Sequence, residues 1–348
     1  MYKIILVSCL IIIVGLGFFL IFSNKQTKIE SPISTNPNME NKSSSLTPFP
    51  FWEMTIPYLR SQNYKSGLGD LQKISENQDY ISYLTSYTSD GLEINGLLTK
   101  PAGQQPPGGW PAVVFIHGYI APSTYQTLGQ SYSAYVDYLA RNGLVVFKID
   151  LRGHGESEGE PGGAYYSSDY IIDTLNAYAA LQSSSFVNPQ RIGLWGHSMA
   201  GNVVLRSLVA KPDIAAAVIW AGAVYSYEDF AKYRLNDQSY QAPQMTSERR
   251  RKRQELFDAY GEFNKDSSFW KQVAATNYLN ELKGAIQLHH AVDDKVVNID
   301  YSRDLIKLLD QTSMVDEFYE YQNGGHNLTG SSFTQAMQRT VEFFKKYL

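Results

Sequence analysis

Ser198 lies in a stretch whose residue types could perform nucleophilic chemistry. The stretch 191–201 (RIGLWGHSMAG) joins an apolar run to a helix-like segment through a tight turn. Gly196 and Ala200, two positions before and after the serine, would let a strand and a helix pass close together. This is the layout of a nucleophile elbow, in which a strained turn pushes the serine hydroxyl out of the fold. An ordinary strand-to-helix loop is the alternative, because the pentapeptide alone is a weak signal.

A serine hydroxyl is a poor nucleophile and needs a base that takes its proton as it attacks. His326, in the glycine-rich stretch 323–327 (NGGHN), is the predicted base because it follows the last predicted strand. An acid must orient that histidine, and the adjacent residues Asp293 and Asp294 both qualify by position. The other five histidines compete with His326. His117 and His154 sit in glycine turns, His197 flanks the serine, and the His289-His290 pair would face opposite sides of a strand, which makes it a poor metal site.

The elements that would position these residues alternate between strand and helix from residue 80 onward. Short apolar runs predict buried strands, and periodic segments predict helices at 132–141 and 170–181. An opening hairpin is predicted at 81–85 and 92–98, around the turn signal Asp90-Gly91. The buried strands are predicted at 112–116, 144–149, 192–195, 215–220, 286–289 and 317–321. This alternation indicates the α/β class, with a mostly parallel sheet covered by helices on both faces.

Five further motifs occur in an order that resembles a known family. They are DGLEING at 90–96, HGY at 117–119, DLRGHGES at 150–157, DKVV at 294–297 and GH at 325–326. Together with GHSMAG at 196–201, they make residues 80–348 resemble an α/β-hydrolase, and more narrowly the catalytic domain of the prolyl oligopeptidase and dienelactone hydrolase group. Two residues depart from the family pattern, Ala200 where glycine is usual and Asn298 where proline often stands.

The resemblance implies a triad of Ser198, Asp294 and His326 that acts through an acyl-enzyme. It selects Asp294 over Asp293, because the family acid stands one residue before a pair of branched apolar residues. It also implies an oxyanion hole made by the backbone N–H groups of Tyr119 and Met199. Neither a metal nor an organic cofactor is expected.

More than sixty residues separate Ala221 from Ile286, which is more than an ordinary crossover needs. We expect a helical cap insertion at about 225–280, whose aromatic residues would either cover an apolar site or form a small core of the cap itself. These aromatic residues are Tyr225, Tyr227, Phe230, Tyr233, Tyr240, Phe257, Tyr260, Phe263, Phe269 and Trp270. The basic run 249–253 (RRRKR) is interpreted as a solvated helix face, with contact to anionic lipid headgroups as the alternative.

The N-terminal segment predicts a membrane location. Residues 4–22 are uncharged and mostly apolar, and as a helix they would span roughly 30 Å. We therefore expect residues 1–22 to be a single-pass anchor, with a cleaved signal peptide and secretion as the alternative. Residues 23–79 are predicted to be a flexible linker and approach segment, and 80–348 the catalytic domain, placed outside the cytoplasm.

Composition and motifs together predict a membrane-tethered serine hydrolase. A net charge of −4 and a 43% hydrophobic composition indicate a globular chain without a nucleic-acid-binding surface. The predicted substrate is a small peptide or ester, and a peptidase similar to the prolyl oligopeptidase family is the first hypothesis. A carboxylesterase or lipase-like hydrolase is the alternative. A catalytically silent binding module is the third hypothesis, and the complete triad argues against it. The oligomeric state stays open.

Overall fold

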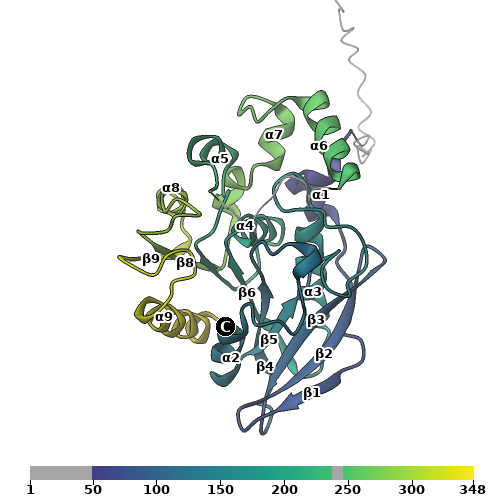
Figure 1. Cartoon of the computed structure of the whole chain (residues 1–348), viewed down its shortest axis with the longest axis vertical. Helices are drawn as coiled ribbons and strands as arrows, with labels where there is room; N and C mark the ends of the chain where they lie inside the picture. The colour runs from purple at the N-terminus through teal and green to yellow at the C-terminus, as the bar shows by residue number, and fades with distance from the viewer. Residues whose placement is uncertain (1–48, 237–245) are drawn as a thin grey trace, which may run out of the picture. The chain divides into compact units, whose positions relative to one another are not determined.

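The computed structural model describes residues 49–236 and 246–348 (Figure 1). The predicted anchor at 4–22, Cys9 and Tyr240 of the expected cap lie outside the described residues. Residues Pro48–Leu348 form one compact unit, and the fold described below is that of this unit.

A nine-stranded sheet forms the centre of the described part of the chain. Its strands are β1 (Gln72–Glu76), β2 (Tyr80–Ser89), β3 (Leu92–Pro101), β4 (Trp110–Ile116), β5 (Val145–Ile149), β6 (Val187–His197), β7 (Ala216–Trp220), β8 (Ala285–Ala291) and β9 (Val315–Tyr321). They lie in the order β1-β2-β3-β5-β4-β6-β7-β8-β9. Every predicted strand is confirmed, and so is the predominantly parallel sheet, because β5, β4, β6, β7, β8 and β9 pair in parallel.

The β2–β3 hairpin forms where the sequence predicts it. Its turn places Asp90 at φ 51° and Gly91 at φ 80°. Two positive φ values in a two-residue loop make the turn that matches the twist of antiparallel strands, and glycine adopts such a φ without strain. The hairpin joins the parallel strands through antiparallel pairing of β3 with β5.

Helices cover both faces of the sheet. They are η1 (Trp52–Met54), α1 (Ile56–Ser61), η2 (Pro122–Thr124), α2 (Ser133–Arg141), α3 (Asp169–Gln182), α4 (Ala200–Ala210), α5 (Tyr227–Tyr233), α6 (Ser247–Tyr260), α7 (Ser268–Val273), η4 (Ala275–Glu281), α8 (Asp300–Leu309) and α9 (Ser331–Tyr347). α2 and α9 pack side by side against one face, and α3 and α4 lie together on the other (Figure 1).

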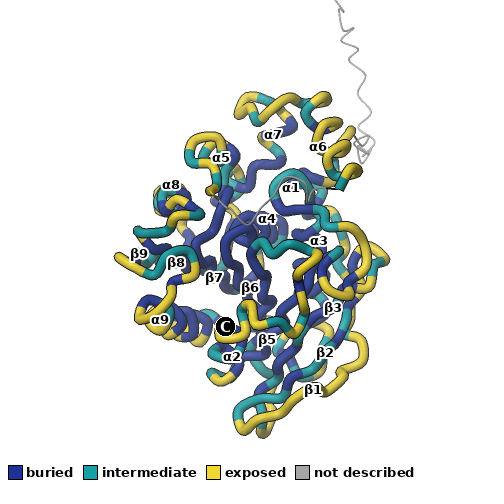
Figure 2. The backbone as a smooth tube through the Cα atoms, viewed as in Figure 1, coloured by how far each residue is buried: buried dark blue, intermediate teal, exposed yellow. Residues whose placement is uncertain are grey.

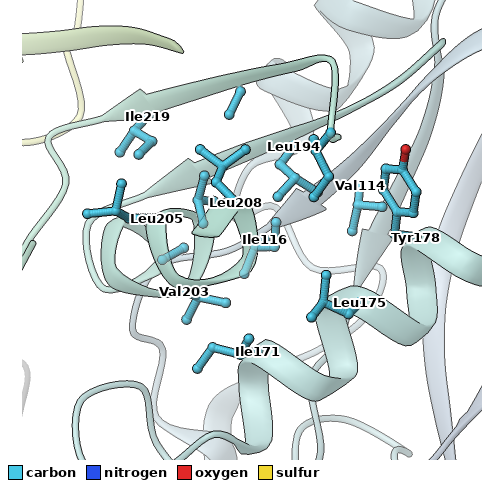
Figure 3. Packing of buried hydrophobic residues seen from close by; sticks show 14 of the residues in the cluster. Val114, Ile116, Ile171, Leu175, Tyr178, Leu194, Val203, Leu205, Leu208 and Ile219 are labelled. Atoms are coloured by element: carbon cyan, nitrogen blue, oxygen red, sulfur yellow. The ribbon is translucent and has the colours of Figure 1, made fainter. Parts of the chain in front are cut away.

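The central strands are buried because apolar side chains extend from both of their faces. Figure 2 shows β5 to β7 in the colour of buried residues, whereas β1 is exposed. In Figure 3 the side chains of Val114, Leu194 and Ile219 from the sheet meet Val203 of α4 and Leu175 of α3. Burial of apolar residues on both faces explains why these strands occur in the sequence as continuous apolar runs.

Residues 49–79, which the sequence placed in a flexible linker and approach segment at 23–79, form helices and a strand on the domain. Met54, Ile56 and Leu59 are at most 1% exposed, and β1 pairs with β2. Pro57 stands in the first turn of α1, and the Thr55 hydroxyl accepts a hydrogen bond from the backbone N–H of Tyr58, which caps that helix. The apolar side chains of residues 49–61 (FPFWEMTIPYLRS) pack both on each other and on the rest of the domain.

The predicted cap is present as α5, α6, α7 and η4. Its small core is shared with the N-terminal segment, because Met54 packs with Tyr227, Leu256, Phe269 and Trp270. Cap aromatic residues both form a small core and cover a cavity, as the two interpretations proposed. Tyr227 belongs to this core and also lines the cavity that Ser198 lines. Within residues 49–236 and 246–348, none of the helices has the length and hydrophobicity to cross a bilayer.

Candidate active site

The turn between β6 and α4 has the strained geometry expected of a nucleophile elbow. Ser198 adopts φ 56°, a value that is unfavourable for a residue with a side chain. A Cβ atom added to Gly196 would lie 2.7 Å from Val204 and 3.1 Å from Ala200, and one added to Gly201 would lie 2.7 Å from the Gly222 backbone. Glycine is required at these two positions because strand and helix pass too closely for a side chain.

The structure brings Ser198, His326 and Asp294 into one chain of hydrogen bonds. The Ser198 hydroxyl lies 2.9 Å from Nε2 of His326, and Nδ1 of His326 lies 2.8 Å from Oδ2 of Asp294. The three residues come from the ends of β6, β8 and β9, which meet at the carboxyl edge of the parallel strands. The Asp294 side chain is 1% exposed and the His326 side chain 16%, so the acid is shielded from solvent more completely than the imidazole.

Asp294 is held in the ionised form by its hydrogen-bond donors. Burial alone would raise the pKa of its carboxyl group, but hydrogen bonds from His290 and His326 outweigh burial and lower that pKa below the ordinary range. The backbone N–H groups of Val296 and Val297 donate to Oδ1 at 2.8 and 3.0 Å. Asp294 is therefore a fixed anion that can orient an imidazole and stabilise its protonated form.

Asp293 has a different position from its neighbour. Its Oδ1 accepts a hydrogen bond from the backbone N–H of Gly325 at 2.8 Å. It therefore ties the loop that carries Asp294 to the loop that carries His326, without facing the imidazole. Of the two adjacent carboxylates that the sequence offered, the structure places Asp294 on the histidine.

The predicted oxyanion loop passes directly beside the serine. A Cβ atom on Gly118 would lie 3.1 Å from Cβ of Ser198 and 2.6 Å from the Tyr132 hydroxyl. The next residue, Tyr119, lines the cavity together with Ser198 and Met199. Tyr119 and Met199, the two residues predicted to supply oxyanion N–H groups, thus lie beside the nucleophile. Tyr119 precedes Ser198 in the sequence and Met199 follows it. Their role as donors stays a prediction.

Tyr132 and His197 form a connection that the sequence did not reveal. The backbone N–H of Gly118 donates to the Tyr132 hydroxyl at 2.9 Å, and that hydroxyl lies 2.7 Å from Nδ1 of His197. Nε2 of His197 lies 2.9 Å from the carbonyl oxygen of His326. Since a carbonyl only accepts, Nε2 carries the hydrogen and Nδ1 accepts from Tyr132. Burial lowers the pKa of His197 to about 3, so the ring is neutral as this pattern requires.

This network joins three loops at the site. It links the oxyanion loop, the elbow and the backbone of the histidine loop, while the Tyr132 ring packs on Phe115 and Trp195. The only local signal in the sequence was the position of His197 next to Ser198. Tyr132 gave none, because its partners lie 14 and 65 residues away.

His290 was also not predicted as a site residue. Its Nε2 lies 3.2 Å from Oδ2 of Asp294 and 3.0 Å from the carbonyl of Val297, and its Nδ1 lies 2.9 Å from the Ser302 hydroxyl. His289, the preceding residue, faces Tyr321 and Gln287 instead. The prediction that the two histidines point to opposite faces is confirmed, and the second of them supports the acid.

A cavity of about 1120 Å³ lies over the serine. Its floor contains Ser198, Met199 and Tyr119, and the cap supplies much of its wall from α5 and α6. Its lining includes many aromatic residues, among them Phe51, Tyr165, Tyr166, Tyr227, Phe230, Phe257 and Phe263. A substrate of small-molecule or short-peptide size fits such a volume.

Comparison with known proteins identifies the fold. Residues 111–256 match the family model for serine aminopeptidases, S33. An acetyl xylan esterase from Paenibacillus sp. R4 superposes with a TM-score of 0.60 at 18% identity, over 84% of this chain and 92% of that one. These matches show that the chain has the α/β-hydrolase fold and that its segment 111–256 is similar to serine aminopeptidases.

Its relatives include both peptidases and esterases. The uncharacterized peptidase YtmA of Bacillus subtilis is 27% identical over 159 residues, which cover 44% of this chain and 58% of that protein. An acylaminoacyl peptidase superposes with a TM-score of 0.58 at 18% identity, over 78% of this chain and 42% of that one. The hydrolase therefore matches only about two fifths to three fifths of the length of these relatives.

Arg152, in the stretch 150–157, is held by three aspartates. It is 8% exposed and its guanidinium contacts Asp173 at 2.7 Å, Asp90 at 3.1 Å and Asp169 at 3.4 Å. Across residues 49–236 and 246–348 no three histidine, cysteine, aspartate or glutamate side chains are placed to share a metal ion.

Proposed function

We propose that this α/β-hydrolase cleaves ester or peptide bonds through an acyl-enzyme on Ser198. The observation that supports this most is the unbroken chain Ser198 Oγ, His326 Nε2 and Nδ1, Asp294 Oδ2, with separations of 2.9 and 2.8 Å at the floor of a cavity. A serine, a base within hydrogen-bond reach and an acid that orients the base are the parts that nucleophilic acyl transfer needs.

The geometry assigns a role to each group in the reaction. Oγ of Ser198 attacks the substrate carbonyl carbon as its proton passes to Nε2 of His326. Asp294 accepts the Nδ1–H hydrogen bond throughout, which selects the reactive tautomer and stabilises the imidazolium. His326 then donates the proton to the leaving oxygen or nitrogen. Water, activated by the same histidine, finally hydrolyses the acyl-enzyme.

The negative charge of the tetrahedral intermediate needs donors close to Ser198. The backbone N–H of Met199 begins α4, and that of Tyr119 belongs to the loop whose Gly118 contacts the serine. Donors fixed in the backbone cost no reorganisation when the charge develops, and one such donor is typically worth a factor of about 100 to 1000 in kcat. The partial positive charge at the N-terminus of α4 acts in the same direction.

Within this class, a serine peptidase for short peptides is our first proposal. The matched family model of serine aminopeptidases and the likeness to YtmA favour it. A carboxylesterase is the second proposal, and a separate observation favours it. Esterase structures are covered almost completely by this chain, 92% for the acetyl xylan esterase, whereas only 42% of the acylaminoacyl peptidase is covered.

The nucleophile is tested with Ser198→Ala in the full-length chain. We expect a fluorophosphonate probe to label the parent enzyme and not the variant, and hydrolysis of p-nitrophenyl butyrate to disappear with the label. Ser157→Ala is the matched control, because Ser157 is also 9% exposed but its hydroxyl accepts a hydrogen bond from the backbone N–H of Asn95, away from the triad. Labelling that persists in Ser198→Ala would contradict the assignment.

The choice between peptidase and esterase needs paired substrates. Alanyl p-nitroanilide and acetyl-Ala-Ala p-nitroanilide test amide cleavage, and p-nitrophenyl acetate and butyrate test ester cleavage. A peptidase turns over at least one anilide with a kcat/KM that Asp294→Asn lowers in parallel with ester turnover. Ester turnover without any anilide turnover would exclude the peptidase and leave the carboxylesterase.

We also propose, from the sequence alone, that residues 1–22 anchor the enzyme in a membrane with the catalytic domain outside the cytoplasm. The apolar segment 4–22 supports this proposal.

A further inference from the structure

The first two turns of α6 present a basic stripe to the cavity. Arg249, Lys252 and Arg253 line it, and the buried residue Leu256 follows one turn later. These positions are related by the i, i+3, i+4 and i+7 spacing of one helix face. Arg250 of the same basic run does not line the cavity and is exposed. The prediction of a solvated helix face is therefore confirmed for residues 250–253, which are exposed, but not for Arg249, which is half-buried.

Most of the cationic groups on this cavity already have partners. Lys252 lies 3.2 Å from Glu248, and Arg152 contacts its three aspartates. The Arg253 guanidinium lies 4.9 Å from the ring centre of Tyr166 and 5.3 Å from that of Phe257. Arg234 is exposed to solvent. These groups need no ligand to offset their charge.

Arg249 differs because it is half-buried and has no opposite charge. Among residues 49–236 and 246–348, no carboxylate lies within 4 Å of its guanidinium. The acids on the same cavity wall are either bonded elsewhere, as Asp169 is to Arg152, or exposed, as Glu160 and Glu262 are. Partial burial of an unpaired cation costs free energy unless a ligand supplies the missing anion.

The guanidinium of Arg249 reaches the wall that leads to the oxyanion loop. Its Nη2 lies so close to Gly163 that a Cβ atom there would be 2.2 Å away. Burial is the main reason that the pKa of His154 is lowered, and the charge of Arg249 adds to that effect. His154 in turn bonds the backbone of Ile120, the residue after Tyr119. Arg249 and Ser198 thus face one continuous space.

We propose that Arg249 binds a carboxylate carried by the substrate while Ser198 attacks a carbonyl of the same molecule. The substrate class is then an ester or amide that also carries a free carboxylate. The planar guanidinium suits a carboxylate because it can donate two parallel hydrogen bonds to it. The aromatic side chains of Tyr227 and Phe230 line the same cavity and would contact the apolar part of such a substrate. This inference rests on the proposed acyl transfer at Ser198.

The experiment compares substrates that differ only in charge. Mono-p-nitrophenyl esters of succinic, glutaric and adipic acid carry the carboxylate on the acyl side, and p-nitrophenyl butyrate, valerate and hexanoate are their neutral partners. A 3-carboxy-4-nitrophenyl butyrate carries it on the leaving-group side. The readout is the ratio of kcat/KM for each anionic ester to that of its neutral partner, so that a general change in activity cancels.

We expect one of these anionic esters to be preferred by about tenfold or more in the full-length enzyme, the effect of one charge-assisted hydrogen-bond pair. Arg249→Gln should remove the preference, and Arg249→Lys should keep part of it, because the charge remains while the fork is lost. Arg250→Gln is the matched control, and its ratio should equal that of the parent enzyme. Added salt should reduce the parent ratio and leave the Arg249→Gln ratio unchanged.

Two outcomes would overturn the inference. One is a parent enzyme that hydrolyses the neutral esters and prefers none of the anionic ones. The other is a preference that survives in Arg249→Gln, provided that its circular dichroism and melting temperature match those of Arg250→Gln. If neither neutral nor anionic esters are hydrolysed, the proposed acyl transfer itself fails, which is a distinguishable result.

Discussion

At the residue scale, the acid of the triad is fixed by donors on all sides. His290 shows how this works, because its Nε2 faces two acceptors, Oδ2 of Asp294 and the carbonyl of Val297. Nε2 must therefore carry a hydrogen, while Nδ1 is hydrogen-bonded to the Ser302 hydroxyl. The ring acts as a fixed donor to Asp294. His290 is a positioning residue that stabilises the charge and orientation of Asp294.

The adjacent aspartates provide a matched pair for a test of the triad. Asp294→Asn should lower kcat by up to about four orders of magnitude, because the amide stabilises the wrong tautomer of His326. Asp293→Asn should cost less than about tenfold, since its Oδ1 can still accept from Gly325 N–H and it does not contact the imidazole. Both variants are measured on p-nitrophenyl butyrate at pH 8. If Asp293→Asn were the crippled enzyme, the acid would be misassigned.

The Tyr132 and His197 network makes a second prediction at this scale. Tyr132→Phe removes the donor to His197 and the acceptor of Gly118 N–H, and an unsatisfied N–H in the oxyanion loop costs about 1–3 kcal/mol. We expect kcat to fall by about tenfold or more with KM little changed, because the loop acts on the intermediate rather than on bound substrate. Tyr138→Phe on the same helix is the control. A change in KM alone, or equal losses in both variants, would argue against a positioning role for Tyr132.

At the scale of elements, the segment 49–61 acts as part of the catalytic fold. α1 packs on α4, the helix that begins at the nucleophile, and Arg206 of α4 donates to the carbonyl of Met54 and to Ser168 Oγ at 3.0 Å. Phe51, Glu53 and Met54 also line the cavity. This N-terminal segment thus supplies part of the cavity wall and braces the helix that begins after the nucleophile.

Leu59 tests the contribution of this segment to stability. It is fully buried in α1, and Leu59→Ala should lower the free energy of unfolding by about 2–5 kcal/mol through lost transfer energy and the cavity left behind. Ser61→Ala, at the exposed end of α1, should change it by less than about 0.5 kcal/mol. Urea denaturation followed by circular dichroism measures both. Equal values for the two variants would mean that α1 does not pack on the domain.

At the scale of the whole molecule, buried neutral histidines make stability depend on pH. Burial lowers the pKa of His117 and His197 to about 3, whereas an unfolded histidine has a pKa near 6.5. Between these values the unfolded chain binds protons that the folded chain does not, so the folded state is favoured less as pH falls. Burial also lowers the pKa of His289. The carboxylates titrate at lower pH. Because the pKa of Asp294 is depressed in the folded state, this group lowers the free energy of unfolding further as the pH falls below about 4.

This linkage predicts acid sensitivity well above the range of the carboxylates. Each of His117 and His197 should cost about 2 kcal/mol of unfolding free energy between pH 7 and pH 5, which makes about 4 kcal/mol for the two. Urea unfolding at half-unit steps from pH 8 to pH 4.5 measures the slope. A free energy of unfolding that stays flat between pH 7 and pH 5 would show that these rings are protonated in the folded state.

The anchor proposal makes the last prediction at this scale. The full-length chain should sediment with membranes and be released by detergent but not by high salt, whereas a chain that starts at Pro48 should stay in the supernatant. Both should have the same kcat/KM on p-nitrophenyl butyrate, because the unit Pro48–Leu348 contains the whole triad. Release of the full-length protein by salt would favour a surface association, and its recovery without residues 1–22 would favour signal cleavage.

The sequence by itself determined the strands and the elbow, because both depend on local physics. Buried parallel strands occur as apolar runs, and a tight strand-to-helix turn needs small residues such as Gly196 and Ala200. The three residues proposed as a triad came from the family resemblance, and they lie at strand ends that meet at one edge of the sheet. The choice between Asp293 and Asp294 came from the family pattern, and the hydrogen bond to His326 agrees with it.

Only the tertiary structure decided which residues support the triad and shape the cavity. Tyr132 contacts His197 across 65 residues, Arg206 contacts Met54 across 152, and Arg249 meets Gly163 only after the cap has folded over the sheet. Such partners have no fixed spacing in the sequence, because the segment between them can have any number of residues. The same reason explains why the sequence did not reveal how residues 49–79 join the fold, since their buried side chains pack on surfaces that the rest of the domain supplies.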